Sequence, residues 1–483
     1  MTGVLKSGEH DDAFNRVEQL LEPIRGSLAL QTFEYFDDTS DFAVEQKRAF
    51  LSDEVRNPRL VYPVLGQDTI HPNRVDLHIN ALNSVIDAAD EYDDSDVSLA
   101  TWGAIGYRLA EAYFLRQAHR LNNPRNAESQ NLAAVQLMKL GHEVYGAPEK
   151  TLFDSALSEM WRQIDMKKFD EQGQRIKAEL AVLLPAPKDA EPIPMLGEEA
   201  FDYYRQKLLE KFALEHEIVL QQWGKIQVRC QETGEKPIFT SGDAYEVFKA
   251  VNAARGGEDR GVSVKMTDKS SYAYLPDVKE MQIGTNHIPI DTPLEMLASV
   301  VHEYGVHVGR NLAGEDSGVF VSATGHYDYL DFEDGLATVC EQIIENRQAE
   351  LTHVNLRHYI NIGFAEGLGA DGPKDFRDVF EVAWRMRALA SPKEDTVITD
   401  KDVQQAKSLA YQNDVRRLFR GTTADIPGVV YTKDLVYVRG RIKATLHLAE
   451  HAGDGDEFER LFSAKYDPTI ELQDRVVRKS QNR

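Results

Sequence analysis

The chain has 483 residues, of which 42% are hydrophobic and 28% charged, and its formal net charge at pH 7 is −24. This acidic excess excludes the basic footprint of a nucleic-acid-binding protein, and no apolar run approaches the roughly 18 residues that a membrane-spanning helix needs. The opening residues lack the apolar core of a signal peptide, and the two cysteines, Cys230 and Cys340, are too few for a disulfide framework. We therefore expect a cytoplasmic globular protein that contacts neither nucleic acid nor membrane.

Most of the chain shows the three- and four-residue spacing of apolar side chains that predicts amphipathic helices. Such helices are expected over three stretches: 101–121, 131–146 and 198–223. The stretch 184–194, LPAPKDAEPIP, is the best linker candidate because its prolines interrupt any helix. It would divide the chain into an N-terminal helical region, 1–183, and a second region, 195–483.

The second region begins with helical sequence and then shows its only strand signals. Three short β-prone runs are separated by turn-forming residues: 261–266, 271–275 and 280–284. A clear helix start follows, with Thr292 as N-cap, Pro293 in the first helical position and Glu295 completing a capping box. A small sheet inside a mostly helical body indicates an α+β fold, with this helix beside the sheet.

The helix that begins at Pro293 carries the sequence HEYGVH, residues 302–307. The pattern is close to the zinc-protease signature His-Glu-x-x-His, but its second histidine arrives one residue later. Residues four apart on an α-helix differ by about 40° in direction, whereas His302 and His307, five apart, differ by about 140°. One π-type turn would bring the two imidazoles into rough register, and Gly305 makes such a turn easier because it lacks a Cβ. The motif therefore predicts a metal site only if the helix contains a π-turn.

The side chains in and after this motif suit two roles at a catalytic zinc site, metal ligand and general base. Neutral imidazoles suit zinc, and a catalytic zinc takes three protein ligands and a water. His302 and His307 are two candidate ligands, and Glu303 is placed to take a proton from that water as general base. A third ligand is expected from DFEDGLATVCEQIIENR, residues 331–347, where Glu333 and Asp334 precede a helical run. Spacing alone does not choose between these two carboxylates.

Three segments resemble a known metallopeptidase family: HEYGVHVGR (302–310), EDGLA (333–337) and TKDLVYVRG (432–440). The family comprises the tyrosine carboxypeptidases that act on α-tubulin and their bacterial relatives, the flavohaemoglobin expression-modulating QEGLA-motif proteins. Its members show His-Glu-Ile-Gly-Thr-His with an arginine three residues later, then Gln/Glu-Glu-Gly-Leu-Ala, then Thr-Lys-Asp-x-x-Tyr-x-x-Gly. With weaker similarity upstream, the resemblance covers about residues 57–465.

This resemblance implies a zincin-like, zinc-dependent carboxypeptidase with 195–483 as its catalytic region. Its substrate would be the C-terminus of a peptide or protein, from which it removes an aromatic residue, tyrosine or phenylalanine. The family's third ligand directly precedes Gly-Leu-Ala, a position held here by the shorter Asp334, so the implied zinc ligands are His302, His307 and Asp334. Tyr437 is expected to donate to the developing oxyanion, and Arg310 and Lys433 to hold the substrate carboxylate.

Two other functions stay open from the residues. Dipeptidyl peptidase III also uses His-Glu-x-x-x-His with a distant glutamate motif, but it releases dipeptides from the N-terminus. The shortened carboxylate of Asp334 would also fit a catalytically weak scaffold that binds peptides. A lone histidine, His326 in GHYDYLD, could contact substrate. The sequence leaves the oligomeric state open.

Overall fold

The protein is predominantly helical and contains a small three-stranded sheet, which confirms the predicted α+β class. The computed structural model describes residues 16, 17, 19–21, 35, 36, 40–66, 71–89, 94–269, 271–287, 289–347, 352–390 and 395–481. No helix within these ranges has both the length and the apolar character that a membrane crossing requires. Cys230 and Cys340 are both free and buried.

The helices of the first half lie before the sheet. They are α2 (Asp41–Leu51), α3 (Pro63–Gly66), α4 (His71–Ala89), α5 (Ser95–Asn122), α6 (Ala127–Tyr145), α7 (Lys150–Asp165), α8 (Glu171–Leu183), α9 (Glu198–Lys211), α10 (Ala213–Thr233) and α11 (Ser241–Ala254). The helix predicted over 101–121 lies inside α5, and the one predicted over 131–146 coincides with α6 to within one residue at its C-terminal end.

The helices of the second half carry the sequence motifs. They are α12 (Pro293–Val300), η6 (Val301–Val308), α13 (Gly309–Asp316), α14 (Phe320–Thr324), α15 (Leu330–Ile344), α16 (His353–Ala365), α17 (Phe376–Leu389), α18 (Asp400–Leu409), η7 (Ala410–Val415), α19 (Arg416–Leu418), η8 (Lys433–Leu435), α20 (Val436–Glu450), α21 (Gly455–Arg460) and α22 (Glu471–Gln481). Of these, η6 and η7 are π-helical, and η8 is a single 3₁₀ turn.

The three-stranded sheet lies where the β-prone runs predicted it. Its strands are β2 (Ser263–Thr267), β3 (Tyr272–Leu275) and β4 (Glu280–Gly284). The central strand is β4, which pairs parallel with β2 and antiparallel with β3. Its Met281 and Ile283 are fully buried against α11 and the motif helix, so the sheet stands beside that helix as expected. A second, two-residue pairing joins β1 (Lys168–Phe169) to β5 (Asp395–Thr396).

The helix predicted over 198–223 is broken in two at Phe212. This residue ends α9 with φ −105° and ψ 28°, so the chain turns before α10 begins. The turn lets the buried Phe212 ring pack against Gly305 in η6, where a Cβ would come within 2.7 Å of a ring carbon. Helical periodicity did not predict the break, because apolar spacing continues through Phe212 and carries no information on contacts with distant segments.

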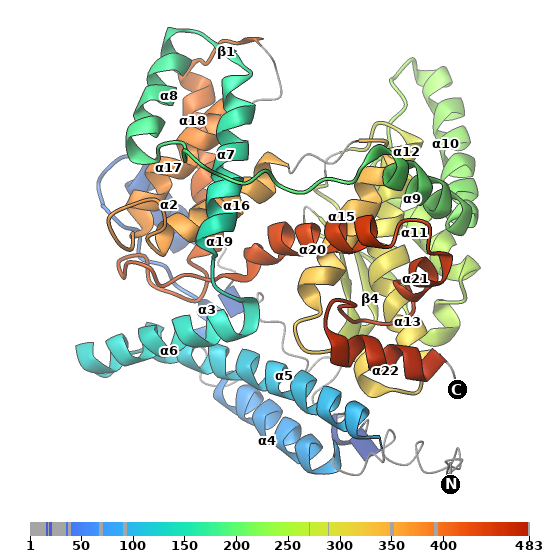
Figure 1. The fold of residues 1–483 in the computed structure, drawn as a ribbon. Helices are drawn as coiled ribbons and strands as arrows, with labels where there is room; N and C mark the ends of the chain where they lie inside the picture. The colour runs from blue at the N-terminus through green and yellow to red at the C-terminus, as the bar shows by residue number, and fades with distance from the viewer. Residues whose placement is uncertain are drawn as a thin grey trace.

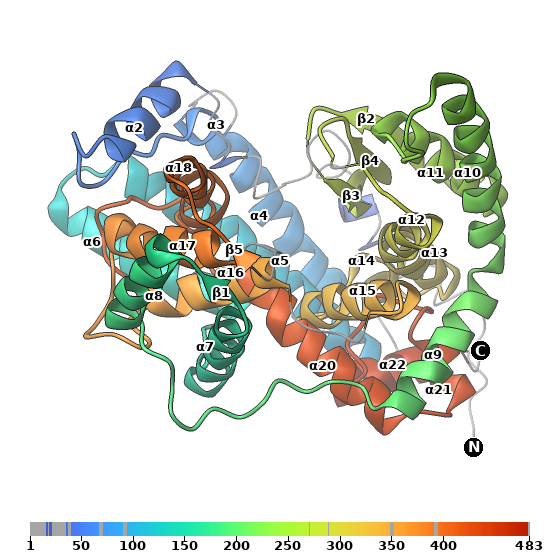
Figure 2. The same cartoon turned by 90° about the horizontal axis from the view of Figure 1, so that it is seen from above.

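The helices form two groups, and α20 extends from one group into the other (Figures 1 and 2). One group contains α2, α7, α8 and α16–α18 around one hydrophobic core. The other contains α9–α13, α15 and the sheet. Helices α4–α6 lie beneath both groups in Figure 1. The cavity with the motif histidines is lined by α5, α6, β3, η6, α15 and α20, so it lies where these parts meet.

The proline-rich stretch connects helices, but the regions on its two sides share their cores. Residues 184–197 contain neither helix nor strand and cross from α8 to α9 (Figure 1). One core combines Phe153 and Ile176 with Phe376, and another combines Phe114 with Tyr431. The boundary predicted at 184–194 therefore separates the chain in sequence rather than in space, and 1–183 is packed as part of the whole.

Two motif glycines explain how α15 and α20 pack so closely. A Cβ on Gly335, in EDGLA, would overlap the backbone of Gly440 and Arg441. A Cβ on Gly440, in VYVRG, would overlap the backbone carbonyl of Asp331 in return. Because backbone atoms cannot move aside as a flexible side chain can, both positions require glycine. This crossing places the first turns of α15 and α20 on the same cavity.

Gly335→Ala is expected to lower the free energy of unfolding by about 3 kcal/mol, because the added methyl forces the two helices apart. The matched control is Gly224→Ala in α10, where a Cβ would meet nothing within 4 Å. Removing that glycine is expected to stabilise the protein by up to about 1 kcal/mol. Urea unfolding of both variants measures the difference, and equal midpoints would contradict the close crossing.

Candidate metal centre

The helix that bears HEYGVH contains the predicted π-turn. It begins as α12, where the Thr292 side chain accepts from the Glu295 backbone and Pro293 takes the first position. The π-helical stretch Val301–Val308 follows directly. The ring centroids of His302 and His307 are 5.3 Å apart, so the distortion brings the two imidazoles together on one side of the helix.

The three side chains with metal chemistry are the ones that emerge from this otherwise buried turn. His302, Glu303 and His307 are half-buried and line a cavity of about 360 Å³. Their apolar and aromatic neighbours face the core: Val301, Tyr304, Val306 and Val308. The π-turn thus separates a packing face from a reactive face within a few residues.

Each imidazole is held from behind by a carboxylate. The His302 Nδ1 lies 3.1 Å from Glu341 Oε2, and the His307 Nδ1 lies 2.9 Å from Glu333 Oε1. Since a carboxylate accepts, Nδ1 of each ring donates, and Nε2 is left for other partners. This is the arrangement by which proteins orient metal-binding histidines and raise their basicity.

The carboxylates of Glu333 and Asp334 lie on different sides of the His307 ring. Glu333 is buried behind His307, where it also accepts from Lys465 Nζ at 2.6 Å and from Arg310 Nη1 at 3.2 Å. Burial opposes its ionisation, but Lys465, His307 and Arg310 together lower the pKa of Glu333 to about 2. Asp334 is instead half-buried in the cavity, with Oδ1 3.7 Å from His307 Nε2. Of the two acids, only Asp334 stands on the side where a third ligand is needed.

Arg310 does not stand where a substrate could reach it, and its predicted role needs correction. Its side chain is fully buried and is absent from the cavity lining. The guanidinium donates to Glu333, to the Ala464 carbonyl at 2.6 Å and to the Tyr466 carbonyl at 2.5 Å. Because these partners already satisfy it, Arg310 holds Glu333 and the C-terminal segment in place instead of holding a substrate carboxylate.

Lys433 and Tyr437 do line the cavity that the π-turn also lines. Lys433 lies in η8, and Tyr437 lies in the first turn of α20. Burial raises the pKa of the Tyr437 hydroxyl far above its usual range, against the opposing charge of Arg417. This phenol is therefore protonated at neutral pH and can act as a hydrogen-bond donor.

The cavity is electrostatically suited to a cation. Burial disfavours the charged imidazole of His302, but the hydrogen bond to Glu341 and the charges of Glu303, Glu341 and Asp334 raise its pKa to about 9. Burial likewise raises the pKa of Asp334, with His307 and Lys433 opposing. The same carboxylates would attract a divalent ion.

Sequence reasoning missed the residues that support the motif from elsewhere in the chain. Glu341 lies seven residues after Asp334, two turns along the same face of α15, and that spacing could have indicated it. Lys465 and Glu111 gave no such signal, because they reach the cavity only through tertiary packing. Glu111 accepts from the Tyr145 hydroxyl at 2.9 Å, and burial raises the pKa of its carboxyl.

A second group of side chains could hold a metal ion. His447, His451 and Glu457 have donor atoms that all lie within 4.8 Å of one another, the one such set among the described residues. The ligand atoms of His302, His307 and Asp334 lie farther apart than this. A side chain would therefore have to rotate before all three could bind one ion. In the second group the Glu457 carboxylate is already paired with Arg460 and Arg478, and it contacts His447 Nε2 at 2.8 Å.

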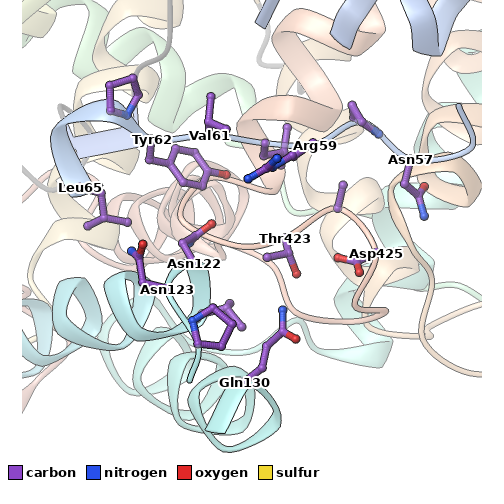
Figure 3. Close-up of a pocket in the computed structure, with 16 residues that line it drawn as sticks. Asn57, Arg59, Val61, Tyr62, Leu65, Asn122, Asn123, Gln130, Thr423 and Asp425 are labelled. Carbon is purple, nitrogen blue, oxygen red and sulfur yellow. The ribbon is translucent and has the colours of Figure 1, made fainter. Parts of the chain in front are cut away.

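A larger cavity, of about 500 Å³, lies elsewhere and has different chemistry (Figure 3). It is formed by residues 57–63 and Leu65, the end of α5, Gln130 of α6 and the loop that contains Thr423 and Asp425. Amide side chains such as Asn122 and Gln130 point into it. The described residues that line it include no histidine or cysteine and a single carboxylate, Asp425, so they do not form a set of three metal ligands.

No protein-family model, no curated protein and no solved structure matches the chain. The resemblance to the tyrosine carboxypeptidases therefore rests on the motifs in HEYGVHVGR, EDGLA and TKDLVYVRG.

Proposed function

We propose that the protein is a zinc-dependent metallocarboxypeptidase that removes a C-terminal tyrosine or phenylalanine from a peptide or protein. The observation that carries the proposal is the π-turn Val301–Val308, which directs His302 and His307 into one cavity beside Asp334. Such turns are rare and occur frequently at functional sites. The carboxylates behind both imidazoles add support, because metal-binding histidines in proteins are commonly oriented by such partners.

His302, His307 and Asp334 would hold the zinc ion, which when bound polarises the scissile carbonyl and makes water more acidic. Glu303, next to His302 on the π-turn, accepts the proton of the attacking water and passes it to the leaving amine. The Tyr437 hydroxyl donates a hydrogen bond to the carbonyl oxygen of the scissile peptide bond as negative charge develops on that oxygen. Glu341 and Glu333 keep the two imidazoles in orientation throughout.

Substrate binding is assigned to lysine and tyrosine side chains that line the cavity. Lys433, a partly exposed lysine of the cavity lining, is assigned to the terminal carboxylate of the substrate. Tyrosine side chains from β3 and α6 supply flat apolar surface for an aromatic residue: Tyr145, Tyr272 and Tyr274. A cytoplasmic location belongs to the same proposal.

A second candidate is a dipeptidyl-peptidase-like enzyme that binds the free N-terminus. Among the described residues that line the cavity, two are lysines, Lys433 and Lys465, and five are carboxylates: Glu111, Asp277, Glu303, Glu333 and Asp334. Such an excess favours a substrate ammonium group over a carboxylate. Glu111 would be its partner, because it faces the cavity without belonging to the proposed zinc site.

Peptides blocked at one end separate the two candidates. We expect zinc-loaded protein to release the last residue from an N-acetylated peptide that ends in tyrosine, and to leave the C-amidated version intact. Mass spectrometry of the products measures this. Release of dipeptides from the amidated peptide, with no cleavage of the acetylated one, would instead establish the second candidate.

Removal of the metal is the control for the same assay. Dialysis against a chelator is expected to abolish cleavage, and addition of zinc to restore it, because no other group of the cavity supplies a comparable Lewis acid. Full activity of protein shown by elemental analysis to contain no metal would contradict the proposal.

A further inference from the structure

The Tyr437 hydroxyl has a charged partner in α19. Tyr437 is partly exposed in the first turn of α20 and lines the cavity of the π-turn. The Arg417 guanidinium of α19 is hydrogen-bonded to this side chain. Because an arginine can only donate, the phenolic oxygen accepts, and the hydroxyl keeps its own hydrogen for another acceptor. Arg417 is not among the described residues that line the cavity, so a bound substrate would meet the phenol and not the guanidinium.

The position of Arg417 is fixed by a two-point ion pair with Asp434. The guanidinium donates from Nε to Asp434 Oδ2 at 2.6 Å and from Nη2 to Oδ1 at 2.7 Å. Two parallel hydrogen bonds of this kind set the plane of the guanidinium as well as its distance. Asp434 is buried in η8, three residues before Tyr437, and residues three apart in a helical turn are neighbours. One guanidinium therefore holds two side chains at the start of α20.

Asp434 is in turn held by a buried network that includes the second π-helix. Its Oδ2 lies 3.7 Å from His358 Nδ1, and His358 Nε2 lies 3.6 Å from Oδ1 of Asp414 in η7. Burial opposes the ionisation of Asp434, but the charges of Arg417 and His358 lower its pKa. Asp434 is therefore an anion at neutral pH, and it keeps its ion pair with Arg417.

A cation bound to the phenolic oxygen improves the phenol as a hydrogen-bond donor. Burial raises the pKa of Tyr437, Arg417 opposes this, and the charges of Asp334 and Asp434 add to it. A hydrogen bond that the phenolic oxygen accepts also polarises the O–H group and strengthens the bond that this group donates. A donor that is oriented before the reaction avoids the cost of turning toward the substrate oxygen as charge develops. Arg417 supplies both effects.

We propose that Arg417 is a positioning residue of the metal centre, which holds the Tyr437 oxygen so that the phenolic hydrogen points at the carbonyl oxygen of the scissile peptide bond. The inference rests on the proposed carboxypeptidase function and adds the residue that orients its oxyanion donor. A buried ion-pair network contributes little net stability, because desolvation offsets the attraction between its charges. The contact of this network with a cavity-lining phenol therefore favours a role in orientation.

Arg417→Lys keeps the positive charge but loses the planar fork that can bind Asp434 and Tyr437 together. For an N-acetylated peptide that ends in tyrosine, we expect the zinc-loaded variant to lose about tenfold or more in kcat, with KM within about twofold of the wild-type value. The matched control is Arg229→Lys, which breaks a two-point pair with the buried Asp243 of α11, outside the described cavity lining. It should keep the wild-type kcat. Zinc analysis and urea unfolding establish that both variants are loaded and folded.

A double-mutant cycle separates orientation of the phenol from a general effect on the fold. Tyr437→Phe alone is expected to lower kcat about 10²-fold. Adding Arg417→Lys to it should lower kcat no further, because the hydroxyl that Arg417 orients is then absent. Asp434→Asn, which removes the charge that fixes the guanidinium, gives a second cycle with the same expected pattern. If Arg417→Lys does not fold, this second cycle decides alone.

Three results would overturn the inference and leave the carboxypeptidase proposal standing. They are losses of kcat that multiply in the double variants, a change of KM alone in Arg417→Lys, and wild-type kcat in either Arg417→Lys or Tyr437→Phe. Failure of the zinc-loaded wild-type protein to release tyrosine from the acetylated peptide would overturn both proposals.

Discussion

Glu303→Gln is expected to lower kcat by about 10²–10⁴-fold while the protein keeps its full zinc content. The amide has nearly the same shape as the carboxylate but cannot accept the proton of the attacking water. Glu303 is half-buried on the reactive face of the π-turn, and its Oε1 lies 4.0 Å from His302 Nε2. Peptide assays with metal analysis on the same preparation measure both quantities.

The matched control is Glu217→Gln, an exposed residue of α10 that is remote from the cavity lining. It should retain wild-type kcat and zinc content. Wild-type turnover in Glu303→Gln would remove the assigned base. Loss of zinc together with turnover would show instead that this carboxylate binds the metal.

Arg310→Met is expected to destabilise the protein by about 3–5 kcal/mol, because it removes a fully buried charge that pairs with Glu333 and satisfies two backbone carbonyls. Zinc affinity should also fall about tenfold or more, since Glu333 orients His307. Urea unfolding and zinc titration measure the two effects.

Lys433→Met is the variant to compare with Arg310→Met. Lys433 is partly exposed on the cavity wall, so its loss should raise KM and destabilise the protein much less than loss of the fully buried Arg310. If Arg310→Met kept wild-type stability and raised only KM, the buried role assigned to Arg310 would be wrong and its predicted role as a substrate ligand would be restored.

The features that the sequence predicted well are those set by local chemistry. The start of α12 follows from the capping box of Thr292 and Glu295 with Pro293, all within four residues. The π-turn follows from the five-residue separation of His302 and His307, which only that distortion can bring to one side. The strands followed from short β-prone runs between turns, and the structure moved their ends by only one or two residues.

The features that the sequence did not predict depend on contacts between distant segments. Arg310 has the residue type of a carboxylate ligand, but the carbonyls of Ala464 and Tyr466 enclose it. The break at Phe212 accompanies a contact of its ring with Gly305, about ninety positions later in the chain. The stretch 184–194 reads as a domain linker, and only the shared cores show that it joins interleaved segments.

The choice between two possible metal positions is the most direct test of the account. Crystals of protein purified without added metal, then soaked in zinc at one equivalent, can be measured on both sides of the zinc absorption edge. The account predicts an anomalous peak bounded by His302, His307 and Asp334. A peak at His447, His451 and Glu457, with none in the cavity of the π-turn, would contradict it.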